Sequence, residues 1–266
     1  MIFRRIRQYL EAIKNFRLID DTFFSTFFDN NESDVEYILR IIMEKPDLKV
    51  LKVQTQKSVE NMYGRSVRFD VFATDEAGKL YNIEVQRADA GAGAGAVSTR
   101  ARYNSSMLDY HELKKKSKHN ELPETFVIFI TEHDVLKNGE KIYHIDRIVR
   151  ETQKVFEDGT HIIYVNGSYK GKKGNDLDDL IHDFFCANPE EMRHRQLAER
   201  VSFLKNNKRE VRKMCKIIED LQNKAKKENL LDNIRSLMET LNLTAQQAMD
   251  ALKVPADKQK EYLILI

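Results

Sequence analysis

The chain has 266 residues, of which 41% are hydrophobic and 32% are charged, and its formal net charge is only +2. This length suffices for one large domain with an appendage, and the small net charge means that affinity for nucleic acid must come from local basic patches. No apolar run approaches the ~20 residues of a membrane span, the basic N-terminus lacks the apolar core of a signal peptide, and the two cysteines lie far apart. We therefore expect a soluble, cytoplasmic protein with reduced thiols.

The first part of the chain predicts helices followed by a strand. Residues 1–14 form a short, basic amphipathic helix, which is typical of a solvated surface but could also contact phosphates. An aromatic-rich helix follows Asp21, which is a candidate N-cap. Residues 35–43 continue as helix, and residues 49–56 alternate enough to predict a strand.

Residues 67–86 predict a β-hairpin around which the rest of the chain is organised. Its strands cover 67–74 and 79–86, and Gly78 supplies the positive φ that the connecting turn needs. Because side chains on a strand alternate between faces, the apolar side chains share the core face. The carboxylates of the hairpin then lie on the opposite face.

The turn geometry places two acidic side chains close together on that face. Asp70 lies opposite Ile83 or Glu84, and Gln86 shares the face of Glu84. Two carboxylates this close repel each other, and the repulsion must be relieved by a proton, by Arg68 or by a cation. Two interpretations follow: a salt-bridged polar sheet face, or a site for Mg²⁺ or Mn²⁺, which prefer oxygen ligands.

A small-residue loop and a basic helix follow the hairpin. Residues 88–96 alternate alanine and glycine, lack the order of a phosphate-cradling motif, and predict a flexible loop without a nucleotide cofactor. Residues 97–114 predict a helix that carries Arg100, Arg102 and Tyr103 beside the carboxylates. This helix could hold a DNA backbone, and the alternative is an ordinary charged surface.

Three further strands and a helix complete the predicted sheet region. Residues 125–131 are continuously apolar, which is typical of a strand buried on both faces. Strands at 142–149 and 161–165 precede an amphipathic helix at 176–185. The seven histidines are dispersed without zinc-ligand spacing, so a zinc site is not expected.

The last part of the chain is helical. Residues 190–227 predict one long basic helix with a coiled-coil-like seam that includes Leu197, Val211 and Leu221 and is broken once, at Lys208. This helix could pack on its own domain, dimerise or lie along DNA, and we expect a homodimer. Residues 230–266 predict short helices, one of which begins with a capping box at Thr244.

Four segments in series resemble the Rpn family, the recombination-promoting nucleases and transposases of the PD-(D/E)XK nuclease superfamily. They are G-R-S-V-R-F-D-V-F-A-T-D (64–75), Y-N-I-E-V-Q (81–86), R-A-R-Y-N-S-S (100–106) and L-P-E-T-F-V-I-F-I-T (122–131). The E-x-Q core alone is weakly specific, whereas the ordered series is much more specific. The resemblance extends from about residue 16 to the C-terminus.

The resemblance implies metal-dependent hydrolysis of DNA, with Asp70 and Glu84 holding Mg²⁺ or Mn²⁺ and with Gln86 as a third catalytic residue. An acidic residue before the aromatic helix often joins the metal site in this family, so Asp20 or Asp21 is a further candidate ligand. For Asp21, helix capping is the alternative. Gln86 stands in the position of the superfamily's Lys, so the hairpin lacks a cationic side chain that would orient the nucleophile.

The expected architecture is α/β, with a central mixed sheet flanked by helices as in restriction endonucleases, plus an all-helical C-terminal extension. We expect a nuclease-like domain at residues 1–189 and a helical extension at 190–266. The expected function is that of a DNA endonuclease in recombination, mobile-element or defence biology. The alternatives are a catalytically weak nucleic-acid-binding relative and a structural interaction module. The expected DNA-binding residues are Arg68, Arg100, Arg102 and Tyr103.

Overall fold

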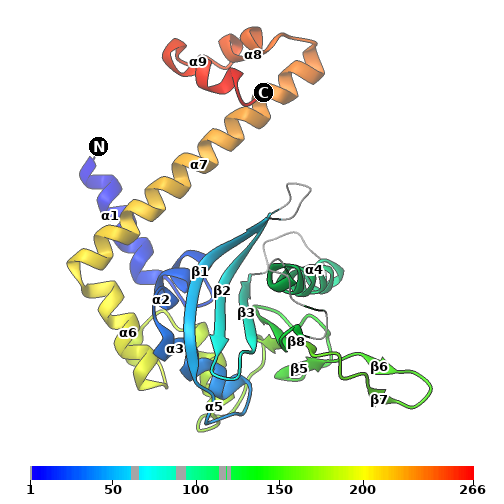
Figure 1. Cartoon of the computed structure of the whole chain (residues 1–266). Helices are drawn as coiled ribbons and strands as arrows, with labels where there is room; N and C mark the ends of the chain where they lie inside the picture. The colour runs from blue at the N-terminus through cyan, green and yellow to red at the C-terminus, as the bar shows by residue number, and fades with distance from the viewer. Residues whose placement is uncertain (1, 61–65, 88–93, 114–117, 119–120) are drawn as a thin grey trace. The chain divides into compact units, whose positions relative to one another are not determined.

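The computed structural model describes residues 2–60, 66–87, 94–113, 118 and 121–266 (Figure 1). Contacts divide the chain into two compact units, Leu10–Glu210 and Met1–Tyr9 together with Val211–Ile266. The larger unit contains the β-sheet, and the smaller unit is helical. Most of the alanine–glycine loop predicted at 88–96 lies outside the described residues.

A six-stranded mixed sheet forms the centre of the larger unit, with strand order β1-β2-β3-β4-β8-β5. Strands β3, β4 and β8 are parallel to one another, and the other neighbouring pairs are antiparallel. The carboxyl ends of the three parallel strands therefore lie at one edge of the sheet, where open α/β sheets bind ligands. The strands are β1 (Val50–Glu60), β2 (Ser66–Asp75), β3 (Leu80–Gln86), β4 (Thr125–Thr131), β5 (Ile142–Ile145) and β8 (Thr160–Asn166).

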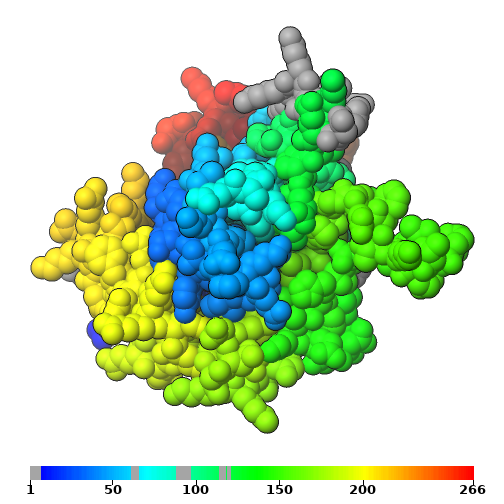
Figure 2. Space-filling view, turned by 60° about the horizontal axis from the view of Figure 1, so that its bottom comes forward, coloured from blue at the N-terminus to red at the C-terminus, as the bar shows by residue number. Residues whose placement is uncertain are grey.

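The strand predicted over residues 142–149 is two strands. β5 ends at Ile145, and the chain then forms a small separate hairpin of β6 (Ile148–Val149) and β7 (Lys154–Val155). This hairpin projects from the larger unit, as the green segment at the right of Figure 2 shows. Its sequence alternates too briefly for the pattern alone to separate it from the central sheet.

Helices cover both faces of the central sheet (Figure 1). α2 (Asp21–Phe28) packs on β1, β2 and β3, and α3 (Glu32–Ile42) packs on β1. α4 (Ala94–Leu113) packs on β2 and β4. The expected α/β architecture, a mixed sheet flanked by helices, is confirmed.

The carboxylate face of the hairpin is buried, which differs from the expectation that it lies opposite the core. Glu84 is 0% exposed and Asp70 is 6% exposed. The physical reason is that α4 crosses this face and forms a second apolar core with it. This core includes Phe72, Leu80, Ala101, Leu108, Val127 and Phe129.

The register of the hairpin agrees with one of the two predicted alternatives. Val71 pairs with Ile83 and Phe72 pairs with Asn82, so the next step of the same register brings Asp70 opposite Glu84. Gly78 has φ +77° in the turn, as predicted.

The predicted cap of α2 is wrong by one residue. Asp20, and not Asp21, occupies the N-cap position, and its side chain makes no capping hydrogen bond. The carboxylate of Asp20 instead accepts a hydrogen bond from the backbone N–H of Arg17 at 2.8 Å. Asp21 is the first residue of the helix.

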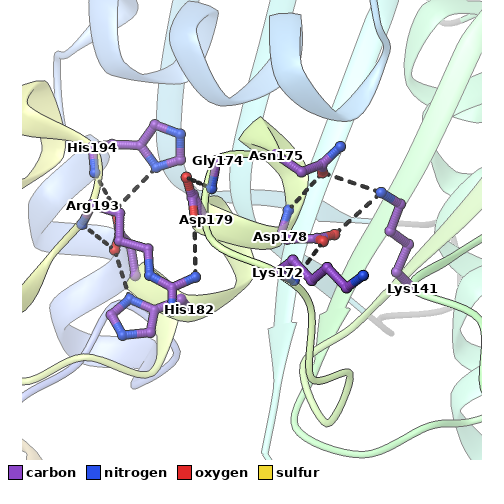
Figure 3. A network of polar contacts seen from close by, with 10 residues as sticks. Lys141, Lys172, Gly174, Asn175, Asp178, Asp179, His182, Arg193 and His194 are labelled. Atoms are coloured by element: carbon purple, nitrogen blue, oxygen red, sulfur yellow. Dashed lines mark hydrogen bonds and ion pairs between the residues drawn. The ribbon is translucent and has the colours of Figure 1, made fainter.

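A network of polar contacts joins α5 (Asp176–Phe184) to the segment that contains Arg193 and His194 (Figure 3). Asp183 is fully buried, and its carboxylate accepts hydrogen bonds from the backbone N–H groups of Arg193 at 2.7 Å and His194 at 2.8 Å. Burial alone would raise the pKa of Asp183, but these bonds and those of the His194 and His182 rings hold it below its usual value. Asp178, His182 and Arg193 of this network line a neighbouring 770 Å³ cavity, which neither hairpin carboxylate lines.

The single helix predicted over residues 190–227 is wrong. Asn207 has an extended backbone (ψ 120°) that ends one helix, and its side chain accepts the N–H of Arg209 at 2.9 Å to begin the next. The first of these helices buries three seam residues in the larger unit: Leu197, Val201 and Leu204. The helices of this part are η2 (Pro189–Glu191), α6 (Arg195–Asn206), α7 (Lys208–Leu241), α8 (Ala245–Ala251) and α9 (Ala256–Leu263).

The smaller unit has a core of its own. Ile234, Met249 and Tyr262 bring α7, α8 and α9 together. The capping box predicted at Thr244 and Gln247 is confirmed at the start of α8. Part of α1 (Ile2–Asn15) also belongs to this unit. Among the helices that the structure describes, none has the length and apolarity needed to cross a membrane.

Candidate active site

Two carboxylates lie where strands β2 and β3 separate. The regular pairing of the two strands ends at Val71 and Ile83. Beyond this point, the backbone N–H of Asp70 donates to the carboxylate of Glu84 at 3.3 Å, and the N–H of Val85 donates to the carboxylate of Asp70 at 3.3 Å. The two carboxylates thus take the places of ladder acceptors, which fixes both side chains relative to the backbone.

Asp70 is supported from the opposite side by β1 and α2. The side-chain amide of Gln56 lies between them, donating to Asp70 at 3.4 Å and to the hydroxyl of Ser25. Gln56 has φ +51°, a conformation that turns its side chain out of the regular β1 alternation. The sequence pattern contains no indication of this contact.

Asp70 opens onto a cleft of 340 Å³, whereas Glu84 is fully buried behind it. Asp70 and Gln86 line it together with side chains from the α2 region and from α4. Because the cleft lies at the carboxyl end of β3, it occupies the edge of the sheet where ligands bind in open α/β folds. The other lining residues are Ile19, Asp21, Arg68, Val85, Arg87 and Arg100.

The electrostatics of the pair favour a bound positive charge. Burial, the charge of Glu84 and the charge of Asp21 raise the pKa of Asp70 to about 8. Burial also raises the pKa of Glu84, although the neighbouring Arg100 acts in the opposite direction. The ionised forms of both carboxylates are therefore disfavoured in this environment, and a bound cation would stabilise them.

Arg100 brings such a charge to the pair from α4. Its guanidinium forms an ion pair with the carboxylate of Glu84 and donates to the side-chain oxygen of Gln86 at 2.7 Å. The guanidinium is half exposed, whereas its Glu84 partner is fully buried. Sequence reasoning placed Arg100 beside the site as a DNA contact but did not predict that it bridges Glu84 and Gln86.

The other predicted site residues are divided between the cleft and its surroundings. Asp21 and Arg68 line the cleft with Asp70. Asp20 is held by Arg17 and Arg87, with the Arg87 guanidinium 3.0 Å from its carboxylate. The two remaining residues lie exposed on α4 and do not line the cleft: Arg102, on the side of the helix opposite Arg100, and Tyr103, on the same side as Arg100.

The donor set fits a hard divalent cation. Two carboxylates and the amide oxygen of Gln86 are the ligand types that Mg²⁺ and Mn²⁺ prefer, and the mutual repulsion of Asp70 and Glu84 would be relieved by such an ion. Within the residues that the structure describes, no group of three or more His, Cys, Asp or Glu side chains is arranged to hold a metal. Asp70, Glu84 and Gln86 would be the protein ligands of such an ion, and the substrate or solvent would supply the remaining ones.

Comparison with known proteins identifies a family for most of the chain. The family model described as PD-(D/E)XK nuclease family transposase matches residues 35–257. The matched region contains Asp70, Glu84, Gln86 and Arg100, whereas Asp20 and Asp21 lie before it. Searches of curated proteins and of solved structures found no significant match.

Proposed function

Because the chain belongs to the PD-(D/E)XK nuclease family of transposases, we propose that it is a metal-dependent endonuclease that hydrolyses the phosphodiester bonds of DNA. The observation that carries this proposal is the buried pair of Asp70 and Glu84 at the carboxyl end of β3. Asp70 and Glu84 would hold Mg²⁺ or Mn²⁺, and such an ion supplies an activated water and polarises the scissile phosphate.

The side chains around the pair have separate roles in this proposal. Asp70 and Glu84 hold the ion, and their backbone hydrogen bonds keep both oxygens in place before it binds. Gln86 accepts from the attacking water or donates to a phosphate oxygen. Arg100 supplies the positive charge that the superfamily's Lys would supply, from a helix instead of from the strand. Arg68, Arg102 and Tyr103 hold the DNA backbone.

The first test is plasmid nicking with and without Mg²⁺, followed by a mobility shift in EDTA. Nicking that requires Mg²⁺ supports the endonuclease. A mobility shift without any nicking would instead favour a catalytically weak relative that binds nucleic acid. The observation that supports this alternative is the uncharged Gln86 in the position of the superfamily's Lys. If the protein neither nicks the plasmid nor shifts DNA, the remaining interpretation is a structural interaction module.

Replacing Gln86 by Ala should lower the cleavage rate by at least about tenfold with little change in DNA affinity. A positioned hydrogen bond to developing charge is typically worth ~10²–10³ in rate, and tenfold is a conservative reading of that range. The measurement is single-turnover cleavage of a labelled duplex at saturating enzyme. Thr74→Ala, on the neighbouring strand but outside the cleft, is the control, and an unchanged rate for Gln86→Ala would leave Gln86 as a polar sheet residue only.

We also propose that the exposed middle of α7 forms a homodimer. Ile217 and Leu221 are apolar and 37% and 47% exposed on this helix, one turn apart. The double variant Ile217→Glu/Leu221→Glu should therefore be monomeric in light scattering, while the wild type is a dimer.

The control for the dimer carries the same change of charge on the other side of α7. Lys216→Gln/Asn223→Glu changes two exposed positions and should stay dimeric. A monomeric wild type, or a loss of dimer in both double variants, would reject an interface at Ile217 and Leu221.

A further inference from the structure

A second cavity lies on the other side of α4 from the candidate active site. It has a volume of 510 Å³, within the usual range of small-molecule sites. Four α4 residues line it: Ser98, Thr99, Arg102 and Ser105. At ~100° per residue, these positions lie on the side of the helix opposite Arg100. One helix is therefore the wall between the carboxylate cleft and this cavity.

The opposite wall is mostly apolar. Ile162 and Tyr164 of β8 form its floor, and Leu136 and Ile145 lie at its rim. The two rim residues are 37% and 38% exposed, which is unusual for large aliphatic side chains outside a binding surface. Tyr164 is buried, and burial raises the pKa of its phenol to about 12, so it stays neutral.

The wall of the cavity holds a buried, unsatisfied polar group. Ser105 is 5% exposed, and its hydroxyl has no hydrogen-bond partner among the described residues. Buried polar atoms without a partner are uncommon in folded proteins, and each costs free energy unless a ligand or water satisfies it.

A positive charge stands at the entrance. Arg102 is exposed, and among the described residues no acidic group forms an ion pair with it. Arg147 also lines the cavity, but its guanidinium is paired with Asp158. Arg102 is therefore the cation at this cavity that remains available to an anionic group.

We propose that this cavity binds the base of an unpaired nucleotide of the DNA, whose phosphate is bound by Arg102. The flat faces of a base match the accessible aliphatic side chains of Leu136, Ile145 and Ile162, since flat base faces are held between apolar as well as aromatic side chains, and the base edge would face Ser105. This proposal rests on the proposed nuclease function, because a strand crossing α4 would place a phosphate at Arg100 about one helix diameter (~10 Å) away.

The test separates the base from the phosphate by comparing two strands in EDTA, where no cleavage occurs. The probes are a short oligothymidylate and an abasic strand of the same length, which carry equal numbers of phosphates. The wild type should bind the oligothymidylate about tenfold more tightly, as expected for one stacked base. Ser105→Leu fills the cavity and removes the unpaired hydroxyl, so this preference should disappear, with binding of the abasic strand unchanged.

Ser106→Leu is the matched control, since it makes the same replacement at the next, exposed position of α4 and should keep the preference. If Ser105→Leu melts at a lower temperature than the wild type, the same comparison is made with Ser98→Leu, which changes an exposed residue at the rim of the cavity. Equal binding of both strands by the wild type, or an equal loss in Ser106→Leu, would overturn the inference alone. Failure of both strands to bind would also overturn the inference, whereas the proposed function stands or falls separately with the plasmid-nicking assay.

Discussion

Replacing Asp70 by Asn or Glu84 by Gln should abolish Mg²⁺-dependent DNA cleavage while the protein remains folded. Each change removes one anionic ligand but almost no volume, and an amide oxygen binds a hard cation more weakly than a carboxylate does. Asp70 and Glu84 are each fixed by a hydrogen bond from the other strand, whereas Asp21, the other carboxylate that lines the cleft, has no such hydrogen bond to the hairpin among the described residues and should not restore activity. The measurement is cleavage of a supercoiled plasmid over a range of Mg²⁺ concentrations.

The same variants should be at least as stable as the wild type without metal. Burial and Glu84 raise the pKa of Asp70 to about 8, so the folded protein binds a proton that the unfolded chain releases near pH 4. The free energy of unfolding of the wild type should consequently fall as pH rises from about 4 to about 8. The Asn side chain of Asp70→Asn does not titrate, so this variant should lose most of the pH dependence of its stability. Thermal melts over a range of pH in the presence of EDTA measure this.

The control is Glu76→Gln, which makes the same chemical change in the exposed turn of the same hairpin. It should cleave at the wild-type rate. Full activity in Asp70→Asn would contradict the assignment of the metal ligands, whereas a lower melting temperature in metal-free buffer would contradict the repulsion between the two carboxylates.

The hairpin was predictable from its sequence because its information is local. Alternation, a turn glycine and the hydrophobic pattern fix which residues face each other, and the structure places Asp70 opposite Glu84 as one of the two expected registers requires. The sheet and its flanking helices follow from the same kind of pattern. Local pattern alone is therefore enough to place the two candidate ligands side by side.

Long-range contacts account for what the sequence did not reveal. Burial of the carboxylate face depends on where α4 crosses the sheet, and no periodicity in the hairpin reports that. The contact of Gln56 with Asp70 depends on a positive φ within β1, which alternation does not predict. The break at Asn207 rests on one extended residue and its side-chain cap; the apolar seam is interrupted at the adjacent Lys208, but one interruption of a seam does not by itself predict that a helix ends.

Arg100 is the most consequential of these long-range contacts. The strand carries Gln86 where the superfamily pattern has Lys, so its sequence alone indicates a site without a cation. The structure brings a guanidinium to the same place from a different element, with Nη1 2.7 Å from the Gln86 side-chain oxygen. A charge assists the reaction through its position relative to the developing charge, so a helix can supply it as well as a strand can.

Replacing Arg100 by Ala should therefore lower the single-turnover cleavage rate by about 10²–10³, the range typical for removing one donor aimed at developing charge. The same variant should reach half-maximal rate at a lower Mg²⁺ concentration, because the guanidinium no longer competes with the ion for the Glu84 carboxylate. Its fold should persist, since the Arg100 side chain is 43% exposed. Both quantities come from one series of rates measured over a range of Mg²⁺ concentrations.

The double variant Arg100→Ala/Gln86→Lys tests whether the charge itself matters. It returns a cation to the cleft from the strand, so it should recover much of the rate lost in Arg100→Ala. Gln86→Lys alone should gain nothing over the wild type, because its ammonium would lie beside the guanidinium that already contacts residue 86. Lys49→Ala, which removes an exposed cation outside the cleft, controls for the loss of a charge. A wild-type rate for Arg100→Ala at a reduced Mg²⁺ requirement would show that Arg100 only competes with the metal and takes no part in cleavage.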